Sequence, residues 1–177
     1  QHPLFKVTVT VYKNLHLYGI LLVPNNLRPG ERRPAVICQH GFQGQPLYAA
    51  GFHKHEQAKA YNRFGAKLAE RGYVVFCPYL CVSDSETRTR LVKKAWLLGG
   101  TPIGLETQKF SRAVDFLQSL PFVDGNRIGF YGLSYGGYTA LWFTPAEPRL
   151  KAVICSGHFN DWQRKTTDLS FKPSCYL

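Results

Sequence analysis

The segment Gly132-Leu133-Ser134-Tyr135-Gly136-Gly137 constrains the fold more than any other part of the chain. It directly follows an apolar run, Arg127–Tyr131, and directly precedes Tyr135–Thr144, which we expect to be helical. The chain must therefore reverse sharply between a buried strand and a helix. Side chains at positions 132 and 136 would collide in such a turn, so both positions require glycine. This pattern predicts a layered α/β sheet with Ser134 at the end of a strand.

Other apolar runs support a sheet of this kind. The alternating segment Val7–Val11 and the run Leu17–Val23 predict an antiparallel hairpin. Pro34–Gln39, Tyr73–Cys77 and Leu150–Cys155 are nearly continuous apolar runs, which are typical of strands buried on both faces. The chain therefore opens with a hairpin and continues with parallel strands.

Two further helices are expected between these strands. Apolar residues in Glu56–Arg71 recur at helical spacing, and a second, longer apolar stripe follows Phe110–Leu120. The polar stretch Ser83–Arg90 is expected to be irregular. The order β-β-β-α-β-α-β-α-β predicts an α/β fold: a mostly parallel sheet with helices on both faces and an N-terminal antiparallel hairpin.

Composition excludes several classes of protein. The 177 residues, 45% of them hydrophobic, suffice for one domain, and no apolar run approaches the roughly 20 residues of a membrane span. Five cysteines without a repeated spacing do not make a disulfide framework. The net charge is +11, but basic groups such as Arg88, Arg90, Lys93 and Lys94 match no nucleic-acid-binding motif and are expected to form a solvated face. We expect neither nucleic acid nor membrane as a partner; compartment and oligomeric state stay undetermined.

Ser134 is the candidate nucleophile. Its position at a helix N-terminus favours the negative charge that develops during acyl transfer, so the motif is typical of a nucleophile elbow. His40-Gly41-Phe42-Gln43-Gly44 follows the first parallel strand and supplies a second candidate donor. We expect the backbone N–H groups of Tyr135 and Phe42 to form an oxyanion hole. The alternatives are a simple helix cap at Ser134 and a plain glycine turn at Gly41 and Gly44.

These motifs together resemble the α/β-hydrolase superfamily, and more closely its dienelactone hydrolase and acetyl xylan esterase-like members. The resemblance runs from about Leu17 to Asp161 and includes Tyr18–Pro24, His40–Phe42 and Arg112–Leu117. It implies a serine esterase that acts on a small carboxylic ester through an acyl-enzyme, with no metal or organic cofactor. Ser134–Tyr138 also resembles the corresponding turn of prolyl-oligopeptidase-type peptidases, so a peptidase remains an alternative.

A serine nucleophile needs a histidine base and an acid, which follow it in that fold as acid and then histidine. After Ser134 the only histidine is His158, and the acid before it, Glu147, is expected at the opposite sheet edge. His158 could act as base or line the pocket, and Asp161 could be the acid. The resemblance implies two more strands carrying the acid and histidine. We therefore expect residues 1–177 to be a single partial domain, truncated at its C-terminus and inactive alone.

Three other features allow weaker hypotheses. A non-catalytic binding protein of the same fold would also lack the acid and histidine. His53-Lys54-His55-Glu56 contains metal-ligand residue types, but without a third spaced ligand it indicates a pocket loop, and we expect no metal. Glu106 and Asp115 are expected in surface or capping roles.

Overall fold

The protein is described here by a computed structural model that covers residues 2–80 and 85–168. Its strands are β1 (Leu4–Tyr12), β2 (Leu15–Leu22), β3 (Arg33–Gln39), β4 (Val74–Pro78), β5 (Val123–Leu133) and β6 (Leu150–Ser156). Its helices are α1 (Pro46–Ala50), the 3-10 helix η1 (Glu56–Tyr61), α2 (Phe64–Glu70), α3 (Ser85–Leu97), α4 (Pro102–Ser119), α5 (Tyr135–Ala146) and α6 (Trp162–Thr167).

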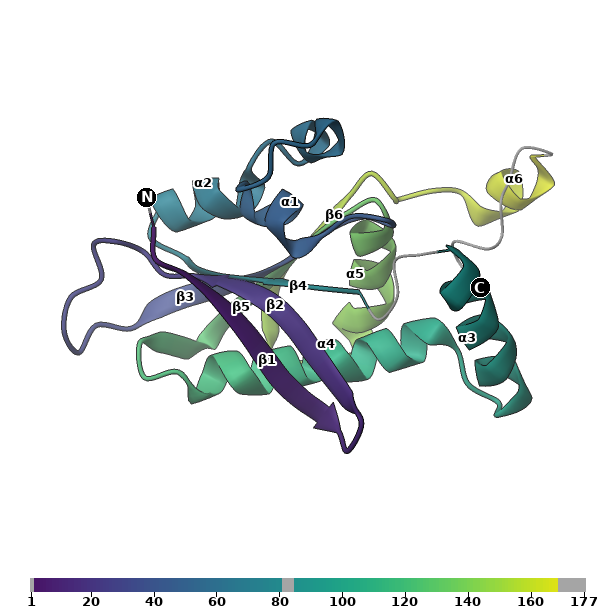
Figure 1. The fold of residues 1–177 in the computed structure, drawn as a ribbon, viewed down its shortest axis with the longest axis horizontal. Helices are drawn as coiled ribbons and strands as arrows, with labels where there is room; N and C mark the ends of the chain where they lie inside the picture. The colour runs from purple at the N-terminus through teal and green to yellow at the C-terminus, as the bar shows by residue number, and fades with distance from the viewer. Residues whose placement is uncertain (1, 81–84, 169–177) are drawn as a thin grey trace.

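The strands form one sheet in the order β1-β2-β4-β3-β5-β6. β1 pairs antiparallel with β2, and β2 with β4, whereas β4, β3, β5 and β6 are parallel neighbours. Figure 1 shows α1 and α2 on one side of the sheet and α4 on the other. The predicted α/β sheet, its opening hairpin and its helices on both faces are confirmed. No helix among the described residues is both long enough and apolar enough to cross a membrane.

Aromatic side chains bind the helices to the sheet. On one face, α4 and α5 place Phe110 and Phe143 against Phe130 of β5, with ring centroids 5.4 to 5.6 Å apart. On the other face, Tyr48 of α1 and Phe64 of α2 belong to a second buried cluster. Burying such a ring contributes roughly 2–3 kcal/mol, so these contacts fix the helices relative to the strand ends.

Two local predictions were wrong. The predicted helix Glu56–Arg71 is divided into η1 and α2, because Asn62 and Arg63 adopt left-handed backbone conformations with φ of 47° and 53°. Of the stretch Ser83–Arg90 that was expected to be irregular, residues 85–90 instead form the start of α3, and residues 83–84 lie outside the described part of the chain. The long predicted stripe is confirmed as α4, whose buried face includes Phe110, Val114 and Leu117.

Candidate active site

Ser134 occupies a strained turn between β5 and α5. Its φ of 57° and ψ of −113° lie in a region that suits glycine rather than serine. Its N–H donates to Ser156 O on β6 at 2.8 Å, and its own carbonyl accepts the Tyr138 N–H at 2.9 Å. The side chain is exposed, and its hydroxyl does not cap the helix. The simple-cap alternative is therefore wrong.

The flanking glycines are required by backbone contacts. A Cβ atom on residue 132 would lie 1.9 Å from Gly136 O, and one on residue 136 would lie 2.5 Å from Gln39 O. Both distances are far below van der Waals contact. The close approach of β5, α5 and β3 at this point therefore excludes any larger residue at these two positions.

The loop after β3 packs beside Ser134. A Cβ atom on Gly41 would lie 3.2 Å from Ser134 Cβ. The Gly41 N–H donates to the Tyr61 hydroxyl at 3.0 Å, and Gly41 O accepts the Gly44 N–H, also at 3.0 Å. The hydrogen bond to Tyr61, which is 20 residues away, attaches this loop to η1.

The side chains of the two residues predicted to supply oxyanion donors lie near each other at this edge. The rings of Phe42 and Tyr135 have centroids 6.1 Å apart. Among the described residues, neither the Phe42 N–H nor the Tyr135 N–H donates a backbone hydrogen bond. Tyr135 N is at the N-terminus of α5, where the helix dipole adds a favourable potential for an anion. Neither amide is therefore occupied by a backbone acceptor among the described residues.

His40 supports this loop from inside the protein. It is completely buried, and because its Nδ1 lies 2.8 Å from the carbonyl of Gly41, that nitrogen carries the proton. Burial lowers the His40 pKa to about 4, and the positive charge of Lys109 acts in the same direction. The imidazole is therefore neutral near pH 7 and acts as a fixed hydrogen-bond donor.

Buried charges surround the aromatic pair, and the sequence did not indicate them. Arg88, expected on a solvated face, is 2% exposed, and Glu106, expected at the surface, is completely buried. Lys109 donates to Tyr79 O at 2.9 Å and lies 3.6 Å from Glu106. Burial is also the main cause of a strongly raised pKa at the Tyr135 hydroxyl, to which Arg88 donates. Val92, four residues after Arg88 in α3, is also buried, so these two side chains share the inward face of the helix.

His158 and Asp161 lie beyond β6 in different surroundings. His158 is buried, with its ring 5.0 Å from the Tyr138 ring and 5.7 Å from the Trp162 ring. Burial lowers its pKa to about 4, with a smaller contribution from Lys165. Asp161 accepts the Arg164 N–H at 3.1 Å and so caps α6. Within the described part of the chain, no side chain forms a hydrogen bond with the Ser134 hydroxyl.

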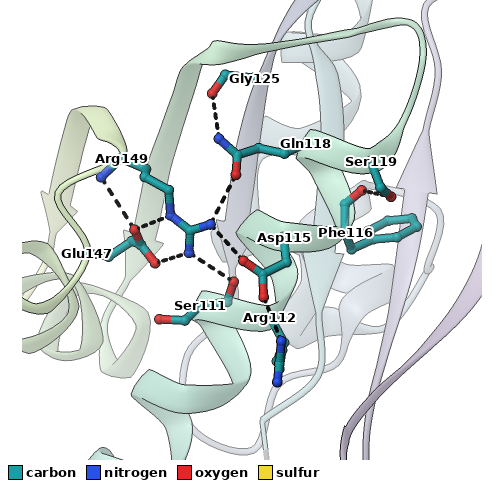
Figure 2. A network of polar contacts seen from close by, with 9 residues as sticks. All are labelled: Ser111, Arg112, Asp115, Phe116, Gln118, Ser119, Gly125, Glu147 and Arg149. Carbon is teal, nitrogen blue, oxygen red and sulfur yellow. Dashed lines mark hydrogen bonds and ion pairs between the residues drawn. The ribbon is translucent and has the colours of Figure 1, made fainter.

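Glu147 lies at the far end of α5 from Ser134, as expected from the length of that helix. Figure 2 shows Arg149 between Glu147 and Asp115, with ion-pair distances of 2.6 Å to both carboxylates. Hydrogen bonds from Arg149 lower the pKa of Glu147, and partial burial opposes this effect. At Asp115 partial burial acts to raise the pKa, but hydrogen bonds from Arg149 and Arg112 together lower it. Glu147 therefore joins α5 to β6 and α4 and has no part in the Ser134 site.

The residues considered for a metal site have another role. His53 and His55 pack against Tyr48, with ring centroids 4.8 and 5.7 Å from that ring. His55 also accepts the Gln57 N–H at the start of η1. Among the described residues, no three His, Cys, Asp or Glu side chains are grouped closely enough to hold a metal ion.

Similarity to known proteins agrees with this arrangement. A model described as the prolyl oligopeptidase family matches residues 104–176. The uncharacterised protein PA2218 of Pseudomonas aeruginosa is 32% identical over 156 residues, which are 85% of this chain and 36% of the relative. A Bacteroides fragilis structure assigned as an acetyl xylan esterase has a TM-score of 0.73 at 15% identity, covering 85% of this chain and 43% of that one. The chain has the α/β-hydrolase fold.

A second α/β-hydrolase structure supports the same assignment. The dienelactone hydrolase from Anabaena variabilis has a TM-score of 0.57 at 23% identity, covering 86% of this chain and 62% of that chain. The chain spans about a third of the length of PA2218. The superfamily resemblance expected from Ser134 and the loop after β3 is therefore confirmed.

Proposed function

We propose that the protein is a serine hydrolase that cleaves small carboxylic esters through an acyl-enzyme intermediate. The observation that carries the proposal is the exposed, strained Ser134 beside two backbone N–H groups that have no backbone acceptor among the described residues. Such a turn holds a hydroxyl clear of the sheet, where a carbonyl carbon can reach it. Similarity to an acetyl xylan esterase and to a dienelactone hydrolase supports an ester substrate.

In the proposed reaction Ser134 Oγ attacks the ester carbonyl and forms a tetrahedral intermediate. The N–H groups of Tyr135 and Phe42 donate to its oxyanion, and expulsion of the alcohol leaves the acyl group on Ser134. Water then releases the acid. Removing one oxyanion donor typically costs about 100- to 1,000-fold in kcat, so each amide matters.

The proton acceptor is proposed to come from outside the described residues. His158 has a pKa of about 4 and packs between aromatic rings, which makes it a weak base at neutral pH. Asp161 already accepts a hydrogen bond from the backbone of α6. The chain spans about a third of PA2218, and we propose that the acid and the histidine lie in a part of the protein that corresponds to the remainder of that relative.

A fluorophosphonate probe tests the proposal directly. We expect it to label full-length protein at Ser134, and we expect Ser134→Ala to abolish labelling while Ser119→Ala, an exposed serine on α4, leaves it unchanged. Labelling of the 177-residue chain alone would assign the base to His158. A folded full-length protein that is not labelled would refute the enzyme proposal and favour a binding protein.

A peptidase is the second candidate, because the prolyl oligopeptidase family model matches residues 104–176. The same nucleophile and donors would serve an amide bond, so the fold does not decide between the substrates. Hydrolysis of p-nitrophenyl acetate and of a dipeptidyl p-nitroanilide should be compared at equal enzyme concentration. We expect a higher kcat/KM on the ester; the reverse order would establish the peptidase.

A further inference from the structure

Arg88 is a buried cation that the proposed reaction does not use. It lies on α3 and is 2% exposed, although arginine is almost never buried without a paired charge or a full set of acceptors. Its Nη2 donates to the Tyr135 hydroxyl. Its Nε and Nη1 are buried and have no hydrogen-bond partner among the described residues. Burying such a charged group costs free energy, so other interactions must compensate for it.

Two aromatic rings replace the missing acceptors. The guanidinium carbon lies 4.6 Å from the centroid of the Tyr135 ring and 5.5 Å from that of the Phe42 ring. Both distances are within the range of cation–π attraction. The side chains that Arg88 contacts thus belong to the two residues whose backbone N–H groups are the proposed oxyanion donors.

These two residues come from separate parts of the chain. Phe42 lies on the loop after β3, and Tyr135 begins α5. An oxyanion hole works only if both donors stay about 2.7–3.1 Å from the same oxygen, and a displacement of about 1 Å can cost 100-fold in rate. A single rigid, planar cation in contact with both rings restricts this separation.

We propose that Arg88 is a positioning residue that holds Phe42 and Tyr135 at the separation required for oxyanion binding. The inference rests on the proposed function. Arg88 does not touch substrate, because its Nε and Nη1 are inaccessible to solvent. Because Arg88 and Val92 are the buried side chains of α3 in the described structure, docking of α3 is coupled to the geometry of the site.

Substitution of Arg88 in the full-length protein tests this role. We expect Arg88→Met, which keeps much of the apolar stem but removes the charge, to lower kcat about 10- to 100-fold and change KM less than about threefold. Arg88→Lys should restore part of kcat because it keeps a cation. The matched control is Arg90→Met, which removes an exposed arginine of the same helix that pairs with Glu86. It should leave kcat unchanged.

A double-mutant cycle separates positioning from general stability. Tyr135→Phe removes the hydroxyl that accepts from Arg88 but keeps the ring and the backbone N–H. Arg88→Met should therefore cost less in this background than in the wild type. A trifluoromethyl ketone, which forms a tetrahedral adduct with a serine, should lose affinity for Arg88→Met in proportion to kcat/KM.

The outcomes distinguish the inference from the function on which it rests. If Arg88→Met raises KM at constant kcat, Arg88 binds substrate and the positioning role is wrong. If it lowers the melting temperature while the folded fraction retains wild-type kcat, Arg88 is merely structural. Both results leave the serine hydrolase intact. Failure of the probe to label wild-type Ser134 would instead overturn the proposed function and this inference together.

Discussion

The strained backbone at Ser134 lowers the stability of the folded protein. A non-glycine residue at this φ and ψ costs about 1–3 kcal/mol, whereas glycine loses about 0.5–1 kcal/mol more conformational entropy on folding. The backbone strain therefore outweighs the entropic loss. We expect Ser134→Gly to raise the free energy of unfolding by about 1 kcal/mol, measured by urea denaturation.

The matched control for this prediction is Ser134→Ala. It removes the hydroxyl but keeps a Cβ atom, and so keeps the strain. It should leave the free energy of unfolding within about 0.5 kcal/mol of the wild type. Equal stabilisation by both variants would assign the cost to the hydroxyl rather than to the backbone.

The sequence alone predicted those residues whose roles depend on contacts with near neighbours in the chain. Gly132 and Gly136 are required by contacts within and next to one turn, so the turn at Ser134 was predictable from their spacing. Arg88 was not predictable, because its burial depends on Phe42 and Tyr135, which are distant in sequence. A basic residue near other basic residues is usually solvated, and here tertiary contacts override that tendency.

Among the elements, the division between η1 and α2 shows why helical spacing was misleading. Tyr61, the last residue of η1, directs its hydroxyl to the Gly41 N–H, and the left-handed residues Asn62 and Arg63 then reorient the chain into α2. A continuous helix would have preserved the apolar spacing but lost this change of direction. The spacing of Tyr61 and Phe64 satisfies both arrangements, and only the contact with the loop after β3 distinguishes them.

The Arg149 network joins three elements, α4, α5 and β6 (Figure 2). The Glu147 side chain is only 4% exposed, so removing its partner leaves a nearly buried carboxylate without compensation. Because Arg149 itself is 36% exposed, solvent screens part of the loss. We expect Arg149→Met to lower the free energy of unfolding by about 1–3 kcal/mol, measured by chemical denaturation.

An exposed ion pair provides the control for Arg149. Arg127 pairs with Asp124 with an arginine side chain that is 60% exposed, so Arg127→Met should cost less than about 1 kcal/mol. Neither variant should change fluorophosphonate labelling of Ser134, since the Arg149 network is at the other end of α5. A loss of labelling in Arg149→Met alone would mean that this network reaches the site.

For the molecule as a whole, His40 makes stability depend on pH. Its pKa is about 4 in the folded protein, below the ordinary value of about 6.5 for an unfolded chain. Between these values the unfolded chain binds the proton and the folded protein does not, so stability falls as pH is lowered from about 6.5 to about 4. The full effect of His40 is about 3 kcal/mol. His158, with a similarly lowered pKa, adds to it in the same direction.

This window separates histidine from carboxylate effects. The pKa values of Asp115 and Glu147 are lowered from 3.8 and 4.5, so their contributions to stability begin to be lost only as pH falls to about these ordinary values. We expect His40→Asn, whose amide can donate to Gly41 O, to flatten the dependence of the unfolding free energy between about pH 6.5 and about pH 4. His16→Asn, on the exposed hairpin, should not. An unchanged slope in His40→Asn would show that His40 titrates normally.

The two edges of the sheet predict how the 177-residue chain behaves by itself. In the described structure β6 pairs only with β5, so it is an edge strand. Its residue Ile154 is 55% exposed. An unpaired strand with exposed apolar side chains promotes edge-to-edge association. We expect this chain to self-associate with rising concentration in light scattering, and Ile154→Lys to reduce the association.

Phe5→Lys on β1, at the opposite edge, should have little effect, because the polar residues Lys6, Thr8 and Thr10 already discourage pairing there. If instead Phe5→Lys restores the monomer, association runs through the hairpin, and the free edge of β6 does not govern how this chain assembles.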